Sequence, residues 1–141
     1  MKKAIIKWSI FLAMVLIAVC AIRFNRSQLV LYTQIERIEF QGYHSCDGPV
    51  SETVVLSEGE ARKVLTHLNF SSYAGQVNAE GCTSDFKFAI YLKNGKLIRI
   101  HEAGRFGLEV EQPKGQYWVK SNALANYAHE LIEKYGLLIS E

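Results

Sequence analysis

The sequence lacks the common catalytic signatures: it has no phosphate-binding loop, no GxGxxG, no HExxH and no GxSxG. Its 14 acidic residues are scattered, so no pair of carboxylates stands out for acid–base chemistry. We therefore expect no enzymatic activity, no cofactor and no metal site. The alternative is a small envelope enzyme that uses some of four polar residues: His44, Asp85, Arg99 and His101.

A large excess of charge is also absent, because the net charge is only +2. Residues 1–26 hold five of the 16 lysines and arginines and no acid, which leaves 11 basic against 14 acidic residues in the rest, a charge of −3. A slightly acidic domain lacks the clustered cations that nucleic-acid binding requires. We expect no nucleic-acid partner, and we interpret the basic part as the flank of a membrane segment.

One long hydrophobic run is present. Residues Ile10 to Ile22 are apolar without interruption. As a helix, the longer segment 4–22 spans about 28 Å, close to the thickness of a bilayer core. Residues 1–26 are thus predicted to be a single-pass membrane anchor, with the N-terminus inside and the C-terminal domain extracytoplasmic. The alternative is a signal peptide cleaved near Val19-Cys20-Ala21, which also exports the domain.

Only three cysteines are present, and Cys20 lies in the hydrophobic run. Cys46 and Cys82 stand in polar, loop-like surroundings of a domain that we expect to be exported, where disulfides persist. We predict a disulfide between them, closing about 36 residues. A metal site of His44, Cys46 and Cys82 is the alternative, although His44-x-Cys46 is not a usual zinc spacing.

The rest of the chain divides into a stem, residues 27–34, and an exported domain, residues 35–141. Alternation of apolar residues predicts strands at 35–41 and 50–56. Residues 70–84 are rich in serine, glycine and asparagine and are predicted to be the longest loop.

Two amphipathic helices are predicted from local signals. Ser57 and Glu60 have the form of a capping box before an apolar stripe over 58–69. The second helix, 122–135, is predicted to start after Ser121 and to end at Gly136.

A hairpin is the clearest strand signal. Residues 85–93 and 96–103 alternate and are joined by Asn94-Gly95, which predicts a two-residue turn. That turn pairs Ile90 with Arg99, Phe88 with His101, and Lys87 with Glu102. Arg99, His101 and Glu102 then form a polar cluster at one end of the hairpin. The cluster either binds an anion or a carboxylate or is a solvated sheet edge.

Two more strands are predicted at 108–112 and 116–120, and the second carries Tyr117 and Trp118 on opposite faces. The predicted order is β-β-α-β-β-β-β-α after the N-terminal transmembrane helix. Strands joined by hairpins with two amphipathic helices indicate an α+β domain, an antiparallel sheet packed on two helices.

This layout resembles that of small membrane-anchored or secreted α+β domains of bacteria, often called domains of unknown function. The shared features are a short anchor, an isoleucine-rich first strand, a capped helix, an Asn-Gly hairpin and a terminal Tyr-Trp strand before a helix. The resemblance covers most of the chain and assigns no functional residue.

These observations predict a membrane-anchored extracytoplasmic binding or accessory module without catalytic activity, whose partner is an envelope protein. We expect contacts from the loops 42–49 and 70–84 and from four side chains: Tyr73, Arg99, His101 and Trp118. The alternative is a subunit of a membrane complex that pairs through its N-terminal helix.

Overall fold

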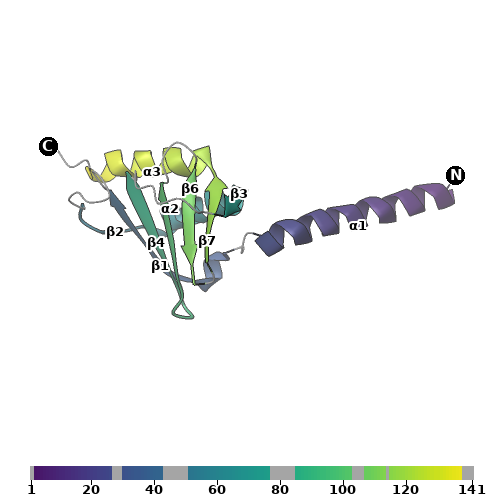
Figure 1. Ribbon diagram of the computed structural model, residues 1–141, viewed down its shortest axis with the longest axis horizontal. Helices are drawn as coiled ribbons and strands as arrows, with labels where there is room; N and C mark the ends of the chain where they lie inside the picture. The colour runs from purple at the N-terminus through teal and green to yellow at the C-terminus, as the bar shows by residue number, and fades with distance from the viewer. Residues whose placement is uncertain are drawn as a thin grey trace.

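The computed structural model describes residues 2–26, 30–42, 51–76, 85–102, 107–113 and 115–137. Over these residues the fold is α+β, with a seven-stranded antiparallel sheet and three helices (Figure 1). Two predicted features lie outside the described residues: the Cys46–Cys82 disulfide, and residues 43–49 of the predicted contact loop, which include His44.

The elements follow one another along the chain as α1 (Lys2–Arg26), the 3-10 turn η1 (Tyr32–Gln34), β1 (Ile35–Gly42), β2 (Val54–Val55), α2 (Glu58–Asn69), β3 (Ser72–Gln76), β4 (Phe86–Leu92), β5 (Leu97–Glu102), β6 (Leu108–Gln112), β7 (Gly115–Lys120) and α3 (Asn122–Tyr135). In the sheet the strands are ordered β2-β1-β4-β5-β6-β7-β3.

Both predicted helices of the domain are confirmed to the residue, because their ends are set by local chemistry. At the start of α2, the backbone N–H of Ser57 donates to the Glu60 carboxylate at 2.8 Å. At the start of α3, the Ser121 hydroxyl accepts from the N–H of Leu124 at 3.1 Å. Gly136 ends α3 at φ +63°, a left-handed conformation that favours glycine.

The prediction of a loop over 70–84 is wrong in its first half, because residues 72–76 form strand β3 at the sheet edge. β3 has no run of alternating apolar residues, and it is held by pairing with β7, where Tyr73 lies opposite Val119. The predicted strand 50–56 is much shorter than expected, since in its described part only Val54–Val55 pair with β1.

The β4–β5 hairpin is confirmed, but its predicted register is wrong by one residue. Ile90 pairs with Ile98 and Phe88 with Ile100, because the turn holds three residues instead of two. Gly95 adopts φ +80° in this turn, and the N–H of Leu92 donates to the carbonyl of Lys96. A slip of one residue moves side chains to the other face. Arg99 and His101 therefore leave the apolar face to which the predicted pairs assigned them.

The sheet has one apolar face, and α2 and α3 cover it (Figure 1). Phe40, Phe86 and Phe88 form the centre of the core, with ring centroids 4.7 to 6.4 Å apart and no exposed surface. Side chains at such separations gain aromatic packing in addition to burial of apolar area. The other face of the sheet, which we call the helix-free face, carries mostly polar side chains.

The two helices are tied together at Glu60, whose side chain is only 8% exposed. Its carboxylate accepts hydrogen bonds from Ser57, from Lys134 and from the hydroxyl of Tyr135 at 2.9 Å. Burial alone raises the pKa of Glu60, but the hydrogen bonds from Lys134, Ser57 and Tyr135 outweigh it and lower the pKa to about 2.

Helix α1 extends away from the domain in Figure 1, and its described side chains, Ile5 to Cys20, are all exposed. They include Trp8 and Phe11, whose rings meet edge to face at 6.2 Å. The predicted helix is therefore present. Of the helices in the described part of the chain, none combines the length and the apolarity needed to cross a membrane.

We predict that Glu60→Gln removes part of the acid sensitivity of the fold. A carboxyl group whose pKa is about 2 when folded and 4.5 when unfolded contributes stability above pH 4.5 and loses it as the pH falls toward 2. The contribution is at most about 3 kcal/mol, since one pKa unit corresponds to about 1.4 kcal/mol. Urea unfolding between pH 7 and pH 2, followed by circular dichroism, measures it.

Glu58→Gln is the matched control, because Glu58 is an exposed residue of the same helix, and its ion-pair partner among the described residues is Arg62. Its loss changes the free energy of unfolding by about 0.5 kcal/mol or less. If wild type and Glu60→Gln lose the same free energy of unfolding between pH 5 and pH 2, Glu60 does not contribute the predicted acid-sensitive stability.

Candidate functional site

The structure brings three of the four predicted contact residues to one surface. Arg99 and His101 lie on β5 and point to the helix-free face, because their neighbours Ile98 and Ile100 are buried in the core. His101 is opposite Glu109, which is in turn opposite Trp118 of β7. Directly opposite residues share a face, so Trp118 belongs to this surface as well.

Tyr73 does not join them. It lies opposite Val119, a buried core residue, and its ring centroid is 6.2 Å from that of Tyr117, which packs against the core. Tyr73 therefore belongs to the helix-covered side at the edge of the sheet, where 39% of it is exposed.

Cross-strand ion pairs organise the helix-free face. His101 Nε2 is 3.2 Å from the carboxylate of Glu109, which is nearly buried at 8% exposure. Two residues away on the same strands, the guanidinium of Arg99 is 3.5 Å from the carboxylate of Glu111. These pairs hold the long side chains of β5 and β6 in defined positions.

A second part of the helix-free face lies on β1 and β4. Arg37 stacks its guanidinium 3.9 Å from the centre of the Tyr91 ring and donates to Glu39 at 2.8 Å. The hydrogen bond with Arg37 is the main reason that the pKa of Glu39 is lowered. The face thus combines arginine, tyrosine and tryptophan with charges of both signs. This composition is typical of protein interfaces and unsuited to a polyanion.

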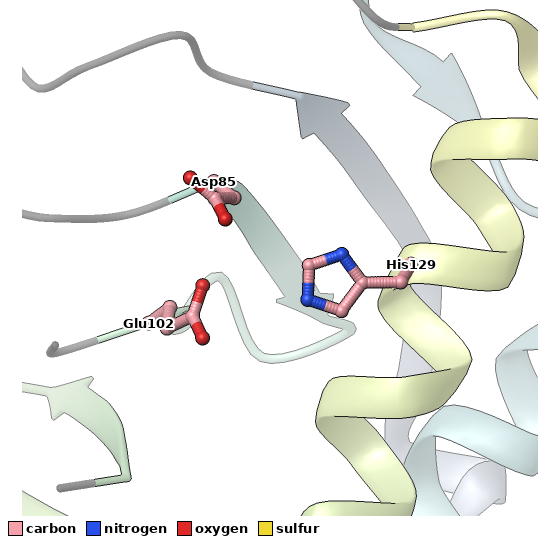
Figure 2. Close-up of side chains that lie close together, drawn as sticks. All are labelled: Asp85, Glu102 and His129. Atoms are coloured by element: carbon pink, nitrogen blue, oxygen red, sulfur yellow. The ribbon is translucent and has the colours of Figure 1, made fainter. Parts of the chain in front are cut away.

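A separate cluster forms where α3 passes the far end of the β4–β5 hairpin. Asp85 immediately precedes β4, Glu102 ends β5, and His129 stands on the exposed side of α3. One donor atom from each residue lies within 4.8 Å of the other two. Figure 2 shows the imidazole extending from the helix toward the two carboxylates.

Burial and the neighbouring side chains determine the electrostatics of this cluster. Partial burial raises the pKa of Glu102, and the nearby carboxylate of Asp85 raises it further. The backbone N–H of Asp85 and the side chain of His129 act in the opposite direction. The imidazole of His129 is also packed edge to face against the buried ring of Phe86, at 5.9 Å between centroids.

Sequence reasoning named Asp85 as a candidate, but only for an enzyme, and it did not group Asp85 with Glu102 and His129. No spacing motif connects the three, since they are brought together by the hairpin and by the docking of α3. The available signal was the position of Asp85 and Glu102 at the open ends of two paired strands.

No family model, no curated protein and no solved structure matches this chain.

Proposed function

We propose that this protein is a membrane-anchored binding module: α1 is inserted in a bilayer, and the helix-free face contacts an envelope protein outside the cytoplasm. The observation that carries the proposal is that the apolar surface of α1 is exposed on every side. From Ile10 to Cys20 this helix is apolar on all sides with no amphipathic stripe, and its described side chains, Ile5 to Cys20, are all exposed. The domain completes its core without them.

An apolar helix with no covered side requires a partner that surrounds it, and lipid does this. The predicted membrane segment continues beyond the described side chains, to Ala4 on one side and to Ile22 on the other. Lys2 and Lys3 precede this segment and Lys7 lies near its start, and the three support an N-terminus on the inner side of the membrane.

The helix-free face supports the binding part of the proposal. It offers Arg99, His101 and Trp118 beside one another, and arginine and tryptophan are enriched at the energetic centres of protein interfaces. The ion pairs to Glu109 and Glu111 already hold two of these side chains, which lowers the entropy lost on binding. The mixed charge favours a protein partner over an anionic lipid surface.

We predict that Leu12→Lys combined with Leu16→Lys releases the full-length protein from membranes. A lysine at the centre of a membrane helix costs about 3 kcal/mol, so two of them exceed what the remaining apolar residues can offset. Membrane pellets washed with alkaline carbonate are expected to retain the wild type and the control pair Leu12→Ile and Leu16→Ile. Wild-type protein in the carbonate supernatant would contradict the anchor. A C-terminal reporter active only outside the cytoplasm tests the orientation.

We predict that Arg99→Glu weakens partner binding at least about tenfold, because it puts a like charge beside Glu111 and reverses a charge at the centre of the surface. Stoichiometric co-purification from gently solubilised membranes, with mass spectrometry, measures the loss. Arg62→Glu is the matched control: it makes the same charge change on α2, where Arg62 pairs with Glu58 at 2.8 Å.

Replacing residues 4–22 by an unrelated membrane anchor separates the two modes of association. A partner that survives this swap and is lost with Arg99→Glu supports the binding module. A partner that is lost with the swap and retained by Arg99→Glu moves the function to the helix, and the chain is then a subunit that pairs through α1.

A further inference from the structure

The cluster of Asp85, Glu102 and His129 has the donor set of a metal site. It combines one imidazole nitrogen with two carboxylates, and the three residues come from the start of β4, the end of β5 and the middle of α3. Three converging protein ligands with the remaining positions open to solvent are the arrangement of many exchangeable and catalytic zinc sites.

The fold brings two carboxylates together, and the nearest basic group in the described part of the chain is the imidazole of His129 in the same cluster. No lysine or arginine among the described residues forms an ion pair with Asp85 or Glu102. Elsewhere on the domain, acids such as Glu39, Glu60 and Glu111 have a basic partner within 3.5 Å. Asp85 and Glu102 instead lie beside each other, and a cation placed between the two carboxylates removes their repulsion.

The imidazole is positioned independently of the carboxylates. The edge-to-face contact of His129 with Phe86, a residue with no exposed surface, holds the ring at the rim of the core. Because α3 is capped at both ends and packed on the sheet, the imidazole is carried by a rigid element. A surface histidine that served only for solvation needs no such support.

We propose that Asp85, Glu102 and His129 bind a first-row divalent transition-metal ion such as Zn²⁺. Ligand atoms around tetrahedral zinc with bonds of about 2.1 Å are about 3.4 Å apart. The donors lie within 4.8 Å of one another, so the site closes by a shift of about 1.4 Å, for which the exposed side chain of Asp85 is free to rotate toward the imidazole. The imidazole favours zinc, iron or nickel over magnesium and calcium, which prefer oxygen ligands only.

The test is a titration of the full-length protein in mild detergent, after removal of metal by a chelator, with Zn²⁺ in isothermal calorimetry. Mn²⁺ is the second probe, because it binds carboxylates and imidazole and has little affinity for the thiolates of the three cysteines. We expect one ion per chain for the wild type. His129→Ala and Glu102→Gln are expected to weaken binding of both ions at least about tenfold.

His67→Ala is the matched control, because His67 also lies on a helix with its ring packed against an aromatic residue, Tyr127 at 5.8 Å, and it is not part of the cluster. It should bind both ions as the wild type does. Circular dichroism and the thermal unfolding midpoint in chelator verify that each variant is folded. Equal affinity of wild type and His129→Ala for Mn²⁺, or no saturable binding by folded wild type, overturns the site. The measurement uses purified protein, so its outcome is independent of the anchor and of the envelope partner.

Discussion

Two helices can cover only one face of this sheet, and the arrangement of the whole domain follows from that limit. The apolar residues of all the long strands must point to the covered side, and the two helices must remain together to cover it. Glu60 meets the second requirement, because its buried carboxylate joins the N-terminus of α2 to Lys134 and Tyr135 at the end of α3. The opposite face is left to polar side chains, and these must satisfy one another across the strands.

The same limit explains why the two candidate sites occupy different places. The helix-free face is wide and presents paired charges with aromatic residues, a surface suited to a macromolecule. The cluster of Asp85, Glu102 and His129 lies at the boundary of the covered face, where the sheet ends and α3 passes over it. There a polar group can be half-buried and still reach water, which is the setting of a small-ion site.

Local signals in the sequence were enough to predict the helices and most strands. Ser57, Glu60, Ser121 and Gly136 act within one turn of the chain, so their effect is readable without the fold. The register of the hairpin was not readable, because two- and three-residue turns both accommodate Asn94-Gly95 and differ in the backbone conformation of Asn94, which has a positive φ only in the two-residue type I′ turn. β3 was missed because its stability comes from pairing with β7, more than 40 residues further along the chain.

The candidate sites show the same difference between local signals, which the sequence reveals, and long-range contacts, which it does not. Arg99, His101 and Trp118 were noticed as residue types, but their common surface required the correct register and the neighbouring strands. Glu102 and His129 belong to elements that were predicted correctly, yet their proximity depends on how α3 docks, which no periodicity encodes.

The two outer strands of the sheet are both poor templates for another chain. β2 has only two residues, and β3 is interrupted by a register shift between Tyr73 and Gly75. A long, regular edge offers unpaired N–H and C=O groups that recruit a strand from a second molecule. Under the proposed membrane anchor, copies on one membrane would meet far more often than free copies in solution. Blunt edges would let such a population stay crowded without polymerising, so that contact between neighbours would be left to side chains.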